Sequence, residues 1–511
     1  MNLLTDSWIP VQQAGLQEKI TFQQLLCGEK GGEICLPRDD MEFACLQLLV
    51  ALTQVLFTPS DKKALVQRIK NPLTPEEYAS GCEGKKDWFD LNHPETPFMQ
   101  FRSVKAKEPT PMDKLMAGVA DGTNKTFVNP QGLADGLCAS CVSIALYNTA
   151  YNCPSAGGGF QPGMRGSTSI TVLIATDSLR KTIWHNILTV ESLNKEMPWY
   201  SQTSCMTPNY IDGLPPGAQY VFSEIGINRG LFWQPAKYQL CEPQPNLVCS
   251  CCGDTGRIYT GFLKEKLQPK YTISGAWPHP LSSRTFVIKK GGREEKFPSF
   301  TTTQPTWVHL PELVAEIQKD KEGYHPAPVI AQLRSYGANR LSFYVGGYRN
   351  GIKTTATIVE RRHEMFSLAD GWKDNSIVID ELIRNAQSYK NALSRALEDF
   401  YKLAIMSATS KKNRDRIKKI ASQYSSVFYQ QTENLIHDTL AHIDFDQPQD
   451  DLKSLYSDLK TVVIHLFNQA TEPYKQEPKM LKALASSRRL LHQYLKELEA
   501  QGGNHEPAKS A

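Results

Sequence analysis

The sequence contains no hydrophobic run long enough to cross a membrane, and it carries little net charge for its length. The most apolar stretch, residues 43–57, is interrupted by Gln47, Thr53 and Gln54, so it predicts a buried helix that is too short to span a bilayer. The 511 residues have a formal net charge of +4. Because acidic and basic residues nearly balance, any surface that binds nucleic acid must be local.

The chain also lacks the cysteine density of a disulfide-stabilised protein. Its 12 cysteines are spread over 511 residues, most of them at scattered positions. Such usage is typical of a reducing compartment. The N-terminal residues show no basic segment followed by an apolar run, which a secretion signal would need. The sequence therefore predicts a cytoplasmic protein without a membrane partner.

Familiar catalytic motifs are missing as well. No G-x-S-x-G elbow occurs. Residues 81–86 end in lysine where a phosphate-binding Walker A loop has serine or threonine, and residues 157–159 do not fit G-x-G-x-x-G. His363 and Glu364 are not followed by the second histidine of a zinc protease, and Leu137 stands where a zinc deaminase has proline. These absences favour a binding protein over an enzyme.

The first two-thirds of the chain mixes helical and strand-like patterns. Segments 169–175 and 284–289 predict strands, and residues 290–293 predict the basic tip of a hairpin that follows the second strand. Asp39 or Asp40 is expected to cap the helix at 43–57. Residues 72–162 are rich in proline, glycine and asparagine, which predicts irregular structure.

Apolar residues recur at helical spacing after about residue 371. Four such runs, joined by short polar connections, predict an up-down four-helix bundle. The predicted fold class is therefore α+β, with a mixed α/β domain over residues 1–365, a helical bundle over 372–500 and a disordered tail over 501–511.

Two separated C-x-x-C pairs are the most informative feature. Cys138 and Cys141 form the first pair, and Cys249 and Cys252 form the second, with Cys251 between them. Four thiolates in a tetrahedron suit a structural zinc ion. The alternative is that these residues are buried, reduced cysteines that act as small hydrophobic side chains.

Several short segments have the composition of nucleic-acid contacts. Three consecutive glycines expose backbone groups that can approach a groove or a phosphate closely, although a plain flexible loop has the same sequence. Basic clusters suit phosphate contacts, although most short lysine runs are simply solvated. The segment 346–351 reads as a turn that carries a stackable ring and a guanidinium group. The candidates are Gly157, Gly158 and Gly159; Lys264, Lys266 and Lys270; Lys289, Lys290 and Arg293; and the basic segment 411–419.

Taken together, these segments resemble CasA, the large subunit of the type I-E CRISPR surveillance complex Cascade. The resemblance runs through nearly the whole chain. It is carried by the opening Met-Asn-Leu-Leu-Thr-Asp-Ser-Trp-Ile-Pro-Val and by segments 36–42, 71–74, 91–100, 229–236, 249–253, 259–266, 277–280 and 346–350.

The resemblance implies a role without catalysis. It implies that the protein recognises the protospacer-adjacent motif, or PAM, in double-stranded DNA and helps to open the duplex for pairing with the guide RNA. The implied partners are the backbone, small and guide-end-capping subunits of Cascade, the CRISPR RNA, the target DNA and the nuclease-helicase that the complex recruits. A structural Zn²⁺ ion is the implied cofactor.

The family's functional positions map onto this chain residue by residue. The resemblance implies PAM contacts by Gly157, Gly158, Gly159 and Lys266. The basic composition of their segment makes Lys289 and Lys290 further candidate DNA contacts. It implies a docking loop near the guide end with Phe127 and Asn129, and zinc ligands Cys138, Cys141, Cys249 and Cys252. Sequence alone leaves Cys251 open as a ligand in place of Cys252.

One departure from the family concerns the wedge that enters the duplex beyond the PAM. The family pattern continues after segment 346–350 with a glutamine, which this chain lacks. A wedge built from Asn350, Gly351, Ile352 or Lys353 is the expectation, since apolar side chains can insert between base steps.

Two other interpretations compete with the resemblance. One is a zinc-dependent DNA-processing enzyme of the same defence locus, against which four cysteine ligands argue because they leave no open position for water. The other is a scaffold that never touches DNA.

Overall fold

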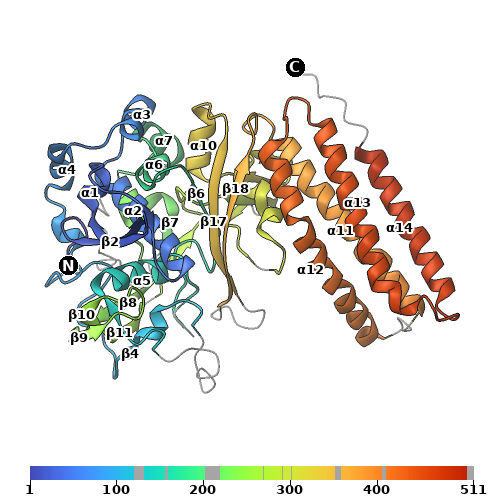
Figure 1. The fold of residues 1–511 in the computed structure, drawn as a ribbon. Helices are drawn as coiled ribbons and strands as arrows, with labels where there is room; N and C mark the ends of the chain where they lie inside the picture. The colour runs from blue at the N-terminus through green and yellow to red at the C-terminus, as the bar shows by residue number, and fades with distance from the viewer. Residues whose placement is uncertain are drawn as a thin grey trace. The chain divides into compact units, whose positions relative to one another are not determined.

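The computed structural model describes two compact units, shown as a ribbon in Figure 1. The described residues are 1–119, 132–155, 159–201, 219–268, 270–290, 292–300, 302–350, 358–404 and 410–502. Unit 1 comprises Met1–Thr301, Gln318–Gly337 and Ser342–Met365, and unit 2 comprises Thr302–Ile317, Ala338–Leu341 and Phe366–Ala511. Unit 1 mixes helices and strands and unit 2 is largely helical, which confirms the predicted fold class. The independent domains expected at 1–365 and 372–500 stay a prediction.

The strands of the described residues form six small sheets. Their orders are β2-β1-β3, β5-β10-β9, β4-β11-β8, β12-β7, β14-β13-β16-β15 and β18-β17-β6. The bounds are β1 Ser7–Gln13, β2 Leu16–Thr21, β3 Glu33–Ile34, β4 Thr110–Pro111, β5 Leu137–Cys138, β6 Thr171–Ile174, β7 Gln219–Val221, β8 Ala236–Leu240, β9 Gln244–Val248, β10 Thr255–Tyr259, β11 Gly261–Lys266, β12 Thr272–Ser274, β13 Arg284–Lys289, β14 Gly292–Lys296, β15 Ile317–Gln318, β16 Glu322–His325, β17 Leu341–Asn350 and β18 Ile358–Leu368.

Helices supply the rest of the framework. Their bounds are α1 Phe22–Leu26, α2 Asp39–Leu56, α3 Lys62–Lys70, α4 Pro75–Cys82, α5 Ala139–Tyr151, α6 Leu179–His185, α7 Val190–Glu196, α8 Ile227–Leu231, α9 Leu310–Val314, α10 Pro328–Ser335, α11 Ser376–Ala404, α12 Lys411–His442, α13 Gln449–Thr471 and α14 Leu481–Gly502. None of the helices in the described part of the chain combines the length and apolar character needed to span a bilayer.

Unit 1 is built around α2 and α5, which pack against each other. The apolar stretch at 43–57 lies within α2, as predicted, and nearly every residue of this helix is buried. The predicted cap is wrong, because Asp39 and Asp40 lie inside the first turn and Arg38 precedes them without a side-chain cap. Asp40 turns instead into the interior, where its carboxylate pairs with the Arg38 guanidinium at 2.7 Å.

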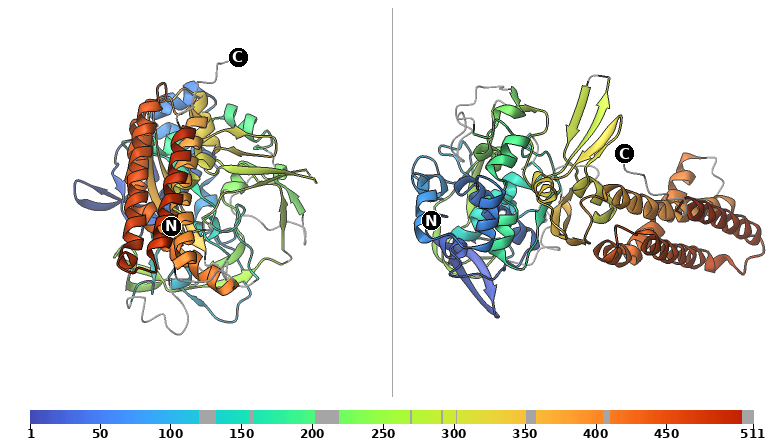
Figure 2. Two further views of the ribbon diagram at one scale, coloured as in Figure 1. Left: turned by 90° about the vertical axis from the view of Figure 1, so that its right-hand side faces the viewer. Right: turned by 90° about the horizontal axis from the view of Figure 1, so that it is seen from above.

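The prediction of irregular structure over 72–162 is wrong for α4 and α5. α5 is buried on almost all sides, so it lacks the alternation of polar and apolar residues that identifies a surface helix. The strand expected at 169–175 is confirmed as β6, and the hairpin at 284–293 is confirmed as β13 paired with β14. Figure 2 shows this hairpin standing out from the body of unit 1.

A turn is predicted at 346–351, but residues 346–350 form a strand instead. These residues end β17, which pairs with β6 in antiparallel register. The ring of Tyr348 is 1% exposed, so it is no stacking surface for a base. Its hydroxyl accepts a hydrogen bond from Asn148 Nδ2 at 2.7 Å and donates one to Asp40 Oδ2 at 2.9 Å. Burial raises the pKa of Tyr348 well above its usual value, so the hydroxyl keeps its proton.

The four helical runs expected in the C-terminal part are confirmed as α11, α12, α13 and α14. α11 packs against each of the other three, and Figure 2 shows the four helices side by side. Leu382, Leu393 and Leu397 of α11 are completely buried, as their spacing predicts. The basic segment 411–419 opens α12, where the Ser410 hydroxyl caps the helix by accepting from Asn413 N at 3.1 Å.

Replacing Tyr348 by phenylalanine should lower the free energy of unfolding by about 2 kcal/mol, because the buried Asp40 carboxylate and the Asn148 amide would lose their common partner. Urea denaturation of the purified chain measures this change. Tyr344→Phe on the same strand is the control, since Tyr344 is 36% exposed and should stay within about 0.5 kcal/mol of the parent. Equal effects of both substitutions would contradict the role given to the Tyr348 hydroxyl.

Candidate metal centre and nucleic-acid interface

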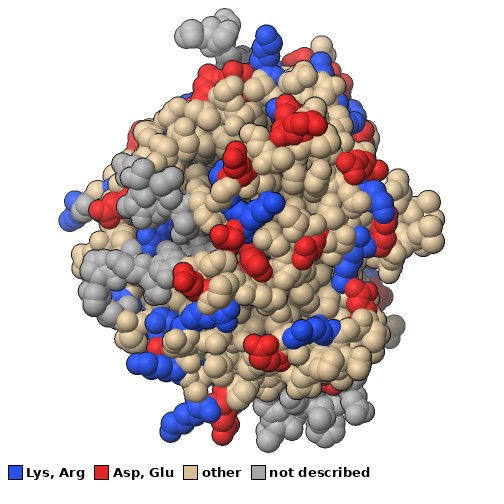
Figure 3. Space-filling view, turned by 90° about the vertical axis from the view of Figure 1, so that its left-hand side faces the viewer, with Lys and Arg blue, Asp and Glu red and all other residues tan. Residues whose placement is uncertain are grey.

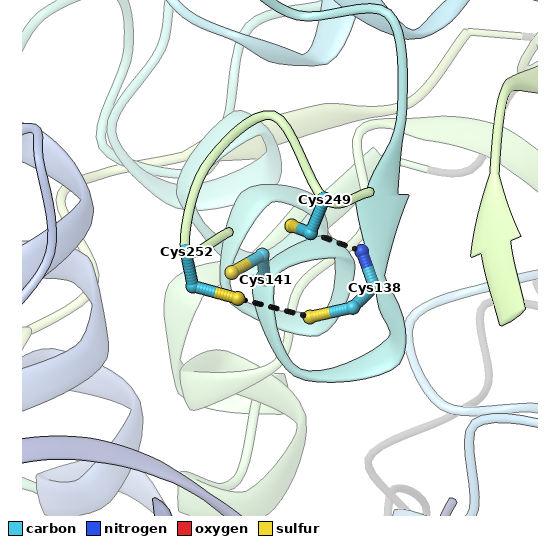
Figure 4. Close-up of side chains that lie close together, drawn as sticks. All are labelled: Cys138, Cys141, Cys249 and Cys252. Carbon is cyan, nitrogen blue, oxygen red and sulfur yellow. Dashed lines mark hydrogen bonds between the residues drawn. The ribbon is translucent and has the colours of Figure 1, made fainter. Parts of the chain in front are cut away.

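Four cysteines from two distant segments meet at one end of α5. Cys138 ends β5 and Cys141 lies in the first turn of α5, whereas Cys249 and Cys252 lie in the turn between β9 and β10. The two segments are joined because β5 pairs with β10, with Cys138 opposite Ile258. Figure 4 shows the four side chains converging on one point.

The cluster has dimensions that suit a metal ion. The four Sγ atoms all lie within 4.8 Å of one another, and those of Cys138 and Cys252 are 3.6 Å apart. Four thiolates at about 2.3 Å from a tetrahedral ion would be separated by about 3.8 Å. Cys138 N also donates to Cys249 Sγ at 3.3 Å, as ligand sulfurs commonly accept backbone hydrogen bonds. The cluster could therefore hold a metal ion with little movement.

The structure shows which of the neighbouring cysteines, Cys251 or Cys252, belongs to the cluster. Cys252 is one of the four clustered residues, whereas Cys251 is buried but is not among them. A hydrogen bond from the Cys141 thiol lowers the pKa of Cys138, whereas hydrogen bonds with Cys138 raise the pKa of Cys141 and of Cys252.

Lys19 of β2 completes the surroundings of the cluster. Its Nζ donates to Cys138 Sγ at 3.3 Å and to Cys252 Sγ at 3.4 Å, and it forms an ion pair with Asp254. Burial alone would lower the pKa of Lys19, but the negative charge of Cys138 and the hydrogen bond to Asp254 raise it above its ordinary value. The sequence offers no signal for this residue, because no motif links it to cysteines more than a hundred positions away.

A second site forms where Gly159 meets Lys266 of β11. Gly159 has a φ of +86°, and a Cβ atom placed on it would lie 2.6 Å from Lys266 Nζ and 3.1 Å from Lys266 Cε. The Lys266 side chain therefore occupies the space that a side chain at position 159 would need. Both residues are exposed. Gly157 and Gly158 lie outside the described residues.

The segment that follows Gly159 is held firmly to the body of unit 1. Gln161 Nε2 donates to Tyr271 O at 2.7 Å, and Tyr271 N donates back to Gln161 Oε1 at 3.1 Å. The guanidinium of Arg165, 5% exposed, donates to Thr171 Oγ1 at 2.8 Å and to Asn152 Oδ1 at 2.9 Å. Arg165 is thus an internal anchor and not a phosphate contact.

Comparison with known proteins agrees with this fold. The family model described as CRISPR-associated protein Cse1 matches residues 2–466. This chain belongs to the Cse1 family.

Solved structures show the same fold at low sequence identity. The crystal structure of CasA from Thermus thermophilus matches with a TM-score of 0.71 at 16% identity, covering 97% of this chain and 99% of that chain. Cse1 from Thermobifida fusca matches with a TM-score of 0.71 at 16% identity, covering 98% of each chain. A chain of a structure titled "CRISPR RNA-guided surveillance complex" matches with a TM-score of 0.65 at 12% identity, covering 96% of this chain and 99% of that chain.

Lys289, Lys290 and Asn350 of this Cse1 family member lie in or beside strands other than β11. Lys289 lies at the end of β13, in a different sheet from Lys266, and pairs with Glu294 at 2.5 Å. Lys290 follows it and is exposed. Asn350 is the last residue of β17. Gly351, Ile352, Lys353, Phe127 and Asn129 lie outside the described residues.

Charged side chains of both signs lie close together on the face of the molecule drawn in Figure 3. Figure 3 shows lysine and arginine interspersed with aspartate and glutamate over one face. This mixture fits a net charge of +4 and agrees with the inference that any nucleic-acid contact is local.

Cys252→Ser should remove bound metal from the purified protein, whereas Cys251→Ser should retain it. The reason is that Cys252 contributes one of the four clustered sulfurs and a serine oxygen is a poor replacement for a soft thiolate. Metal content per chain, measured by elemental mass spectrometry, decides the matter. Loss of metal from Cys251→Ser with retention in Cys252→Ser would show that the ligand set is assigned wrongly.

Lys19→Met should weaken metal binding by about 10- to 100-fold, because it removes two hydrogen bonds and a positive charge from beside the thiolates. Competition against a coloured chelator measures this affinity. Lys30→Met is the matched control, since Lys30 pairs at 2.5 Å with Glu18, the neighbour of Lys19 in β2. An affinity equal to that of the control would contradict the role of Lys19.

Proposed function

We propose that this protein is the large subunit of a type I-E Cascade surveillance complex. In this role it recognises the PAM in double-stranded DNA, helps to destabilise the duplex and start R-loop formation, and recruits the nuclease-helicase that carries out interference. Membership of the Cse1 family and the likeness to a chain of an RNA-guided surveillance complex support the proposal. The single observation that carries it is the contact between Gly159 and Lys266.

The geometry of this contact suits a narrow groove of DNA. Gly159 presents backbone without a side chain, and its positive φ is a conformation that other residues adopt only with strain. Lys266 supplies a donor and a positive charge at the same point. The minor groove offers acceptors on the base edges and, at G·C pairs, one amino donor. A backbone carbonyl and an ammonium group together could distinguish these patterns.

The other partners follow from membership of the complex. We assign the segment with Phe127 and Asn129 to docking near the guide end, and the segment with Asn350, Gly351, Ile352 and Lys353 to the duplex wedge. Lys289 and Lys290 would add contacts to the DNA backbone. The proposed partners are the other Cascade subunits, the CRISPR RNA, the target duplex and the nuclease-helicase, all in the cytoplasm.

The cysteine cluster is proposed to hold a structural Zn²⁺ ion. Cys138, Cys141, Cys249 and Cys252 would be its ligands, and the ion would supply a cross-link between α5 and the β9–β10 turn. Because four thiolates complete a tetrahedron, such a site leaves no position for a reactive water. This supports a protein that recognises DNA without cleaving it, in preference to a zinc-dependent DNA-processing enzyme.

Lys266→Ala should lower the ratio of affinities for matched duplexes with and without the PAM by about tenfold, because a base-edge contact is lost. Gly159→Ala should act in the same direction, since its Cβ displaces the Lys266 ammonium group. Duplex binding by the reconstituted complex, measured by gel shift, tests both variants.

Lys195→Ala provides the control, because Lys195 is an exposed lysine of α7 and should leave the ratio unchanged. Complexes assembled with and without this chain should also be compared. If PAM preference is the same without the chain, recognition fails as its function and a scaffolding role remains.

A further inference from the structure

Two lysines of β11 share one aromatic ring beside Gly159. Phe160 directly follows Gly159 in the chain and is half-buried. The Nζ atom of Lys264 lies 5.3 Å from the centroid of its ring, and the Nζ atom of Lys266 lies 5.8 Å from it. Both distances are within the range of cation–π attraction.

The strand places the two lysines on the same face of the sheet. Lys264 and Lys266 are two residues apart, so their side chains leave β11 on one side, and Glu265 leaves it on the other. In the neighbouring strand β8, Lys237 stands opposite Glu265. The carboxylate of Glu265 accepts a hydrogen bond from Lys105 N at 2.7 Å. The face with Phe160 thus carries two positive charges together.

Each lysine side chain loses rotamer freedom when it is held in one place. The face of an aromatic ring carries partial negative charge, which attracts both ammonium groups. The ring also restricts both side chains before any ligand arrives. A lysine held ready in this way binds with a smaller entropy loss than a mobile one.

We propose that Phe160 is a positioning residue for the PAM contact and that Lys264 is a second DNA contact, directed to a backbone phosphate. In this arrangement, Phe160 holds Lys266 against Gly159 for base-edge recognition. Lys264, two residues before Lys266 in β11, neutralises a phosphate beside the groove. The inference rests on the proposed function, because it names further residues of the same DNA-binding site.

The test uses the reconstituted complex with a guide RNA and matched duplexes that differ only in the PAM. Phe160→Leu keeps an apolar side chain but removes the ring, and it should lower the PAM affinity ratio by about two- to fivefold. Phe160→Tyr keeps the ring and should restore the ratio. Neither change removes a charge, so the dependence of affinity on salt should stay as in the parent.

Lys264→Met should give the opposite result. Loss of one phosphate contact should reduce the slope of log affinity against log salt concentration by about 0.9, with the PAM ratio unchanged. Lys237→Met is the matched control, because Lys237 lies 5.8 Å from the ring of Phe101 and belongs to the opposite face. It should leave both quantities unchanged.

The outcomes separate this inference from the function on which it rests. If Lys266→Ala abolishes PAM preference but Phe160→Leu behaves like the parent, the positioning role of Phe160 is overturned. If Lys264→Met keeps the parental salt slope, its phosphate contact is overturned. If Lys266→Ala itself leaves PAM preference intact, the proposed function fails and the inference fails with it.

Discussion

The pairing of two short strands, β5 and β10, is the contact on which both candidate sites depend. It sets Cys138 opposite Ile258 and so brings the two C-x-x-C pairs together. α5 directly follows β5 and leads along the chain to the segment that carries Gly159. β11 follows β10 after a connection of one residue and ends at Lys266. The cysteine cluster and the Gly159–Lys266 contact are therefore two ends of one arrangement.

A strand pairing of this length is weak by itself, because it offers few hydrogen bonds and little buried area. Four thiols gathered from positions more than a hundred residues apart would add a strong cross-link once they hold a metal ion. Four thiolates around a divalent ion leave two negative charges in excess. Lys19 lies where it offsets one of them, so the N-terminal hairpin is tied electrostatically to the same point.

Buried polar groups explain most of the differences between the sequence-based predictions and the structure. Tyr348 and Asp40 have residue types and neighbours that suggest an exposed turn and a helix cap, yet both are used inside unit 1. Such roles depend on partners brought in from distant strands, and a local pattern contains no information about them. For the same reason Lys19 and Phe160 could not be found from motif spacing.

The sequence by itself determined the fold class, the four C-terminal helices, the β13–β14 hairpin and the family, because periodicity, turn residues and ordered motifs are local properties of the chain. It also supplied the candidate cysteines, Gly159 and Lys266. Only the tertiary structure decided that Cys252 rather than Cys251 joins the cluster, that Lys266 meets Gly159, and that Tyr348 is buried. The physical reason is that strand register and burial are set cooperatively by packing between segments far apart in sequence.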